Sequence, residues 1–193
     1  MTSQMKPLLP FLAMLLVLTS CQDDGISPDS ELLKNIGFES GGSTPSSWQA
    51  VDPFESGNFS FEWSTEEVYE GDRALKISAN ESNRRDFGYW VSAISFDTDE
   101  FVGEELELSV WVKGNMSGEG AALILRGDQE GNDDFVSFVS SLETEAFTGE
   151  FEWTQIKVSD SIPTGIDSFS VFLVLADDTV GEVFFDEVSL RKK

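Results

Sequence analysis

The sequence predicts an all-β fold, an antiparallel β-sandwich, from three observations. Apolar and polar residues alternate along several short segments, and sets of Gly, Asn, Asp or Pro that favour turns separate them. No long stretch has the 3.6-residue periodicity of a helix. The 193 residues include 16 Phe and 5 Trp, which supply enough large apolar side chains to fill a core without disulfides. We expect one folded domain over residues 31–193.

Strands are expected where the alternation is clearest. In 106–113 the even-numbered residues are apolar and would face the core. Segment 169–175 is apolar on both faces, which is typical of a central strand. Segment 183–190 closes the domain and is interrupted by Asp186. The other expected strands are 74–78, 90–96, 121–126, 135–139 and 152–158.

The N-terminal segment has the features of an export signal. Lys6 precedes an apolar run of 11 residues, 8–18, which has the length of a signal-peptide core and is shorter than the roughly 18 residues of a membrane span. Cys21, the only Cys of the chain, follows Leu-Thr-Ser, and this pattern resembles the lipobox of bacterial lipoproteins. We expect residues 1–20 to be a cleaved signal peptide, Cys21 to be acylated, and residues 21–30 to be a flexible acidic tether.

The residues after Cys21 bear on localisation. Gln-Asp-Asp at positions 22–24 resembles the surface-export signal of some Gram-negative outer-membrane lipoproteins. The resemblance implies an outer-membrane lipoprotein that faces the cell exterior and meets the membrane through its lipid anchor only. The alternative is an ordinary secretory signal with an incidental Cys.

Charge and composition exclude several functions. The net charge is −24, and no basic patch is visible, so nucleic acid and anionic lipid are not expected as direct partners. The chain has no His, which excludes Ser-His and Cys-His catalysis and imidazole metal sites. A carboxylate pair for glycoside hydrolysis is not excluded, but 36 acidic residues would supply such a pair by chance.

Several motifs together resemble those of carbohydrate-binding modules of the family 4, 9 and 22 type. They are Asn-Ile-Gly-Phe-Glu at 35–39, Pro45, Trp48, Glu-Gly-Asp-Arg-Ala-Leu-Lys-Ile at 70–77, 106–113, Trp-Thr-Gln at 153–155, and Gly-Glu-Val-Phe-Phe-Asp-Glu-Val at 181–188. The resemblance spans the expected domain and implies a jelly roll of the galactose-binding-like type. It implies the ligand more weakly, because this fold hosts many functions.

The resemblance also implies a structural Ca²⁺ that ties the first strand to the last. Its expected ligands are the carboxylates of Glu39 and Asp186, with backbone carbonyls near Gly71 and Lys76. This donor set is of the kind that Ca²⁺ takes, about 6–8 oxygens. The alternative is that Asp186 accepts hydrogen bonds from nearby backbone or faces water.

A sugar-binding face is expected to carry exposed rings and polar neighbours. Alternation places Trp111 and Glu107 on an outer face, and by the same parity Tyr89 and Phe172 are expected there, with Arg126 contacting sugar hydroxyls. The alternative is that a loop covers Trp111. The other tryptophans, Trp48, Trp63, Trp90 and Trp153, are expected to pack inside.

The sequence therefore favours a non-catalytic cell-surface lipoprotein that binds a polysaccharide or glycan. One alternative is a structural or adhesive surface protein that binds another protein through the same sandwich. A glycoside hydrolase is the third hypothesis, and nothing in the sequence supports it beyond the number of carboxylates.

Overall fold

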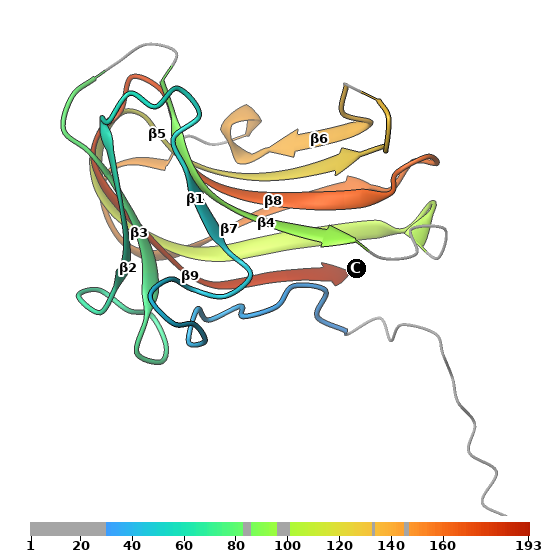
Figure 1. The fold of residues 1–193 in the computed structure, drawn as a ribbon, viewed down its shortest axis with the longest axis horizontal. Coiled ribbons are helices and arrows are strands. Elements are labelled where there is room, and N and C mark those ends of the chain that lie inside the picture. The colour runs from blue at the N-terminus through green and yellow to red at the C-terminus, as the bar shows by residue number, and fades with distance from the viewer. Residues whose placement is uncertain (1–29, 83–85, 96–100, 133, 145–146) are drawn as a thin grey trace, which may run out of the picture.

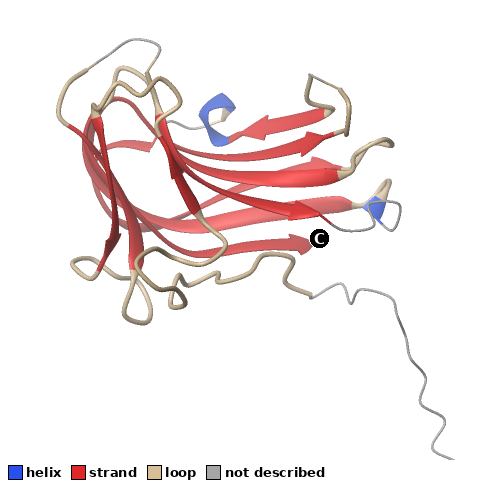
Figure 2. Cartoon of the chain, viewed as in Figure 1, coloured by secondary structure: helices blue, strands red, loops and turns tan. Residues whose placement is uncertain are grey.

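The computed structural model describes residues 30–82, 86–95, 101–132, 134–144 and 147–193. The predicted signal peptide, the expected lipidation site Cys21 and residues 22–29 of the expected tether lie outside these ranges. The described residues form nine strands and a short 3₁₀-helix, η2 (Ser141–Glu143) (Figure 2). Within them, no helix is both long and apolar enough to cross a membrane. All strand pairs are antiparallel, so the predicted fold class is confirmed.

The strands make two curved sheets that share one strand (Figure 1). In chain order they are β1 (Gln49–Val51), β2 (Phe59–Ser64), β3 (Ala74–Ala79), β4 (Gly88–Ser95), β5 (Glu105–Asp128), β6 (Ser137–Ser140), β7 (Phe147–Ser161), β8 (Ser168–Leu175) and β9 (Val180–Lys192). The first sheet has the order β7-β5-β9-β3-β2, and the second has the order β6-β5-β8-β4-β1. The two sheets enclose one hydrophobic core.

The shared strand β5 bends between its two halves. Residues 106–117 pair with β9 in the first sheet, and residues 121–128 pair with β8 in the second. The sequence predicts two separate strands here, but Gly118 and Gly120 have φ of 108° and 93°, values that glycine adopts without strain. The chain can therefore turn the corner as a single strand of 24 residues.

The bend also exchanges the residues that face the core. Even-numbered residues such as Leu106 and Leu108 point inward in the first half, whereas odd-numbered residues such as Leu123 and Leu125 point inward in the second. Inward and outward residues also alternate along β8 and β9, the strands that pair with β5. Phe169 of β8 and Phe185 of β9 point inward and are fully buried. Trp48 and Trp90 belong to this core, as the sequence predicts.

Several predicted strand bounds differ from the structure. The segment 135–139 was expected to be one strand, but β6 begins at Ser137, which leaves Phe135 in a loop with 57% of its surface exposed. The expected strand 90–96 appears as β4, which ends at Ser95, and residue 96 lies outside the described ranges. A run of apolar residues does not by itself mark where pairing begins.

The first described residues lie along the last strand (Figure 1). The carboxylate of Glu31 accepts hydrogen bonds from the backbone N–H of Leu190 at 2.9 Å and the hydroxyl of Ser189 at 2.7 Å. It also pairs with Arg191 Nε at 3.1 Å. The N–H of Leu32 donates to the carbonyl of Leu190 at 3.0 Å. The start of the domain is therefore fixed to β9 by backbone and side-chain contacts.

The bend in β5 gives a stability prediction. We expect Gly118→Ala to lower the free energy of unfolding by at least about 2 kcal/mol, because a Cβ there would collide with the backbone carbonyl of Asp178 as well as strain a left-handed φ. Gly103→Ala is the matched control: its φ is 83°, but a Cβ would meet nothing. Urea unfolding of both variants measures the difference, and equal losses would contradict the close approach at the bend.

Candidate functional site

The outer face of the second sheet carries a pair of aromatic rings on its central strands. Tyr89 on β4 and Phe172 on β8 point away from the core, because their neighbours Trp90 and Leu173 belong to it. Their ring centroids are 5.2 Å apart at an interplanar angle of 71°, the edge-to-face arrangement that aromatic pairs prefer. Both side chains are half-buried. The sequence placed these two residues on one face, and the structure brings them into contact.

Arg126 extends this pair across β5. Its guanidinium carbon lies 4.9 Å from the centroid of the Phe172 ring, within the range of a cation–π contact. Its Nε pairs with the carboxylate of Asp128 at 3.0 Å. This pairing fixes the guanidinium over the ring with more than a third of the side chain still exposed. The face therefore offers a charged hydrogen-bond donor next to an apolar ring.

Four further rings continue the face on both sides, and sequence reasoning missed them. Phe87 stacks on Tyr89 at 5.9 Å, and Phe54 meets Phe87 edge-on at 5.7 Å. On the other side, Phe138 is the register partner of Arg126, and Phe135 lies 5.3 Å from Phe138. We call these residues the aromatic row: Phe54, Phe87, Tyr89, Phe172, Phe138 and Phe135. Phe54 lies in a loop, where strand alternation gives no signal, and Phe135 precedes β6 instead of belonging to the strand expected at 135–139.

The aromatic row includes the most exposed apolar side chains of the described residues. Phe54 and Phe135 are each 57% exposed and Phe138 is 41% exposed. Single exposed apolar residues need no explanation, but a contiguous apolar band on a soluble domain marks an interaction site. The row crosses the sheet from the loop after β1 through β4, β8 and β5 to β6.

The structure separates Trp111 and Glu107 from the aromatic row. Both lie on the first half of β5, so they face outward from the first sheet on the other side of the sandwich. The single outer face expected from the sequence is therefore two faces. Glu107 pairs with Lys157 at 2.8 Å. Trp111 is half-buried beneath Tyr69, whose ring stacks on it at 4.2 Å and 13°, as in the alternative of a covering loop.

Trp153 is not part of the core. Its ring lies 5.7 Å from the ring of Tyr69 on the outer face of the first sheet, whereas the sequence predicted internal packing. The core residues of β7, Ile156 and Val158, have the opposite parity, so alternation along the strand directs Trp153 outward. Trp63 lies against the core and is partly buried, and its indole Nε1 donates to the carbonyl of Phe38 at 2.7 Å.

The predicted metal ligands Glu39 and Asp186 meet at one junction on the first sheet. Asp186 is fully buried, and its carboxylate accepts hydrogen bonds from the backbone N–H groups of Tyr69 at 2.8 Å, Glu70 at 3.1 Å and Glu187 at 2.8 Å. The carboxylate of Glu39 accepts from the N–H groups of Asp72 and Arg73 at 2.8 and 3.0 Å.

Backbone conformation at this junction is unusual on all three segments that form it. Phe38 and Glu187 have φ of 60° and 48°, which is strained for residues with a large side chain. Gly71 has a φ of 79°, and a Cβ there would collide with the Glu39 carboxylate. The glycine is therefore required by the close approach of the acid as well as by its φ.

Burial and charge repulsion raise the pKa of two carboxyl groups of the junction. Burial raises the pKa of Asp186, and its three backbone hydrogen bonds offset part of this rise. The pKa of Glu187 is raised by burial and by the neighbouring charges of Asp186, Glu70 and Glu39. The charge of Glu39 thus contributes to the raised pKa of both Asp186 and Glu187, and that of Glu70 contributes at Glu187.

The donor chemistry of the junction fits a hard cation, although the side chains alone do not enclose one. All donors are oxygens, and a divalent ion would relieve the repulsion among Glu39, Glu70, Asp186 and Glu187. No group of three or more His, Cys, Asp or Glu in the described part of the chain is placed to hold a metal. Backbone carbonyls near Gly71 would have to complete the shell. The carbonyl of Lys76 accepts from Trp90 Nε1 at 3.2 Å, so the structure places that expected donor elsewhere.

Comparisons with known proteins relate the fold to carbohydrate-binding modules and to cyclases. No family model matches the sequence, and no curated protein does. A family 61 module solved with β-1,4-galactotriose, TmCBM61, has a TM-score of 0.55 at 16% identity over 85% of this chain and 99% of that one. The CBM22-1 xylan-binding domain of Xyn10C from Paenibacillus barcinonensis has a TM-score of 0.50 at 20% identity over 81% and 90%.

A cyclase from Fischerella sp. TAU is similar at a TM-score of 0.62 and 14% identity, over 83% of this chain and 95% of the cyclase. The chain also matches 22% of the enzymatically active domain of bacteriophage CBA120 tailspike protein 4. At these identities the similarity shows the fold alone. The chain has the antiparallel, jelly-roll-like fold of the family 22 and family 61 modules.

The raised pKa values predict how stability depends on pH. An acid whose folded pKa exceeds its unfolded value stabilises the fold below the unfolded pKa, about 4, and this stability is lost as pH rises through the folded pKa. In buffer with a chelator, the junction should therefore contribute more stability near pH 4, close to the unfolded pKa, than at pH 7. Glu187→Gln should raise stability at pH 7 by about 0.2–1 kcal/mol and reduce the difference between the two pH values.

The control for this measurement is Glu119→Gln, which removes an exposed carboxylate from the bend of β5. Urea unfolding at both pH values compares the two variants with the unaltered protein. A loss of stability at pH 7 in Glu187→Gln, or an unchanged pH difference, would contradict the repulsion described at the junction.

Proposed function

We propose that this protein is a non-catalytic carbohydrate-binding lipoprotein that holds a polysaccharide or glycan on the aromatic row. The observation that carries the proposal is the contact of Tyr89 with Phe172, with Arg126 over the same ring. The apolar faces of sugar rings pack on aromatic rings, and adjacent polar groups bind the hydroxyls. The row supplies both on one face.

The polar flank of the row has a defined geometry. Asp128 pairs with Arg126 Nε, and the hydroxyl of Ser170 lies 3.5 Å from the Asp128 carboxylate. A guanidinium, a carboxylate and a hydroxyl beside apolar rings give the donors and acceptors that sugar hydroxyls require. The net charge of −24 opposes the approach of strongly acidic polymers, so neutral glycans are the favoured ligand class.

We propose that the protein lies at the outer surface of a Gram-negative bacterium. The support for this localisation is the sequence alone: an apolar run of signal-peptide length, Cys21 in a lipobox-like context and the acidic residues that follow it. Two or more acyl chains on one residue give stable membrane anchoring, whereas a single chain gives marginal anchoring. Mass spectrometry of the mature N-terminus tests the acylation of Cys21.

A protein partner is the second candidate, because the row contains five Phe and only one Tyr. Phe has no polar group, and the exposure of Phe54 and Phe135 at 57% each is equally typical of a protein-binding surface. This candidate corresponds to the adhesive or structural role. Glycan binding and its dependence on Tyr89 decide between the two.

The binding proposal gives a mutational prediction. Tyr89→Ala and Phe172→Ala should each weaken binding of a neutral oligosaccharide by roughly tenfold, since a lost ring contact is worth about 1 kcal/mol or more. Tyr89→Phe, which keeps the ring, should weaken binding less. Isothermal titration with β-1,4-galactotriose and xylan fragments, the ligand classes named for two similar structures, measures the effect.

The matched control is Val102→Ala, because Val102 is an exposed apolar residue outside the row. It should leave affinity unchanged. Equal affinity in Tyr89→Ala and the unaltered protein would refute the row as the glycan site, and a folded protein that binds no glycan in a broad array would favour a protein partner.

We propose in addition that a structural Ca²⁺ occupies the carboxylate junction, held by Glu39 and Asp186 with backbone carbonyls near Gly71. The supporting observations are the burial and the neighbouring charges that raise the pKa of Asp186 and Glu187, the meeting of Glu39 and Asp186 at the loop around Gly71, and the strained backbone around them. A chelator should lower the melting temperature, and Ca²⁺ should restore it, with about 2.7 kcal/mol of stabilisation at a concentration 100 times Kd.

Glu39→Gln should reduce or abolish the calcium response, whereas Glu119→Gln should retain it. Differential scanning calorimetry with and without Ca²⁺ makes the comparison. A melting temperature that is independent of Ca²⁺ at every concentration would mean that the backbone N–H groups alone compensate Asp186 and Glu39.

A further inference from the structure

Three rings form a separate group on the outer face of the first sheet. Tyr69, from the loop between β2 and β3, stacks on Trp111 of β5 at 4.2 Å, and its ring meets Trp153 of β7 at 5.7 Å and 61°. We call these three residues the ring platform. None of them belongs to the core cluster, and Tyr69 is 40% exposed. The platform is therefore an addition to the outside of the sheet.

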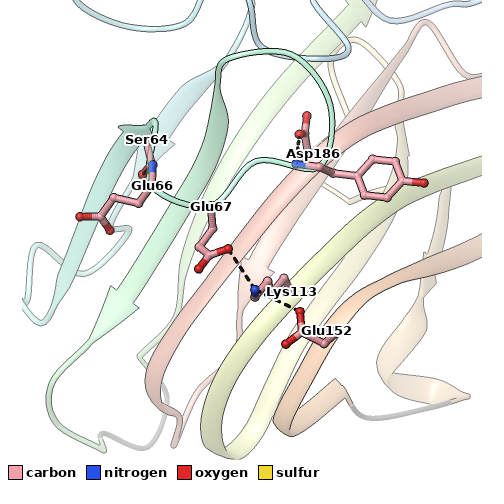
Figure 3. Close-up of polar contacts among 7 residues, drawn as sticks. Ser64, Glu66, Glu67, Lys113, Glu152 and Asp186 are labelled. Atoms are coloured by element: carbon pink, nitrogen blue, oxygen red, sulfur yellow. Dashed lines mark hydrogen bonds and ion pairs between the residues drawn. The ribbon is translucent and has the colours of Figure 1, made fainter.

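The loop that carries Tyr69 is fixed at several points. The N–H groups of Tyr69 and Glu70 donate to the buried carboxylate of Asp186. Glu67 pairs with Lys113 of β5 at 2.9 Å, and Glu152 of β7 pairs with the same lysine at 3.1 Å. Figure 3 shows the lysine between the two glutamates, with Asp186 beyond them. A ring held in this way loses little conformational entropy when a ligand packs on it.

The composition of the platform indicates the class of ligand. Tyr and Trp present a broad apolar surface with a polar group at the edge, and this combination suits a sugar ring better than the Phe-rich aromatic row does. The exposed amide of Gln155 lies opposite Trp111 in the register and can serve a hydroxyl as donor or acceptor. Glu70 and Glu152 are the chain neighbours of Tyr69 and Trp153, and Glu67 and Glu152 share the single cation Lys113, so this region disfavours an acidic sugar or a phosphate.

We propose that the ring platform is a second glycan-binding site, which takes a neutral sugar ring on the exposed part of Tyr69. The two sites lie on opposite faces of the sandwich, so one domain would contact two glycan chains and connect them. This inference rests on the proposed function, because it assigns the same ligand class to a second surface. It goes beyond the proposed function because it predicts a second site, made of residues that are not part of the aromatic row.

The distribution of tryptophan allows the two sites to be measured separately. The aromatic row contains no Trp, whereas the platform contains Trp111 and Trp153. Ligand stacking at the platform should therefore change the indole fluorescence, and a Trp153→Phe variant assigns the signal. Isothermal titration with β-1,4-galactotriose and with xylo-oligosaccharides counts the sites on the purified full chain.

In the unaltered protein we expect two sites and a fluorescence change. Tyr69→Ala should remove one site and the fluorescence change, with roughly tenfold weaker binding at the platform. Tyr69→Phe, which keeps the ring, should retain both. Tyr89→Ala should remove the other site and leave the fluorescence change intact. Leu142→Ala, at an exposed apolar residue elsewhere, is the control, and circular dichroism verifies that each variant folds.

Three results would overturn the inference in different ways. A single site that Tyr89→Ala abolishes and Tyr69→Ala does not alter, with no change of indole fluorescence, would refute the platform and leave the proposed function intact. The absence of any glycan binding would refute both. A folded Tyr69→Phe variant that lost binding would show that the ring stack is not the contact.

Discussion

The alternation of side chains along β5, combined with its bend, determines which residues face the core and which face outward in each of the two sheets. One strand contributes to both sheets, and the residues that face the core change from even to odd positions across the bend. Trp111 and Arg126 are therefore on one strand but on opposite sides of the molecule. Because each sheet packs its inner face against the other, the outer faces are the sheet surfaces that remain available for contacts with other molecules.

The sequence predicted much of the fold but less of the candidate site. Local alternation is sufficient to assign a residue to the inner or outer face of its own strand, and this worked for Tyr89, Phe172 and Arg126. Which sheet a strand joins depends on long-range pairing, so Trp111 could not be separated from the others by parity. Phe54 lies in a loop with no periodic pattern to identify it, and Phe135 was expected in a strand that begins only at Ser137.

The carboxylate junction was located by resemblance rather than by periodicity. The motif at 35–39 and the acid within the last strand indicated Glu39 and Asp186, and the structure brings both to the loop around Gly71. Lys76 lies within β3, where its carbonyl accepts from the indole of Trp90. The loop around Gly71 places its amides on Asp186 and its Tyr69 ring on Trp111, so one segment contributes to both the junction and the platform.

The attachment of Glu31 to β9 has a consequence for mechanical load. A pull on the chain that precedes Glu31 is resisted by its contacts with Ser189, Leu190 and Arg191. At those residues β9 is hydrogen-bonded to β5, whereas its pairing with β3 ends at Phe185. The load is therefore carried by the ion pair and hydrogen bonds of Glu31 and by the ladder between β9 and β5. Unravelling from the first residues of the domain must break these contacts before it reaches the sheet.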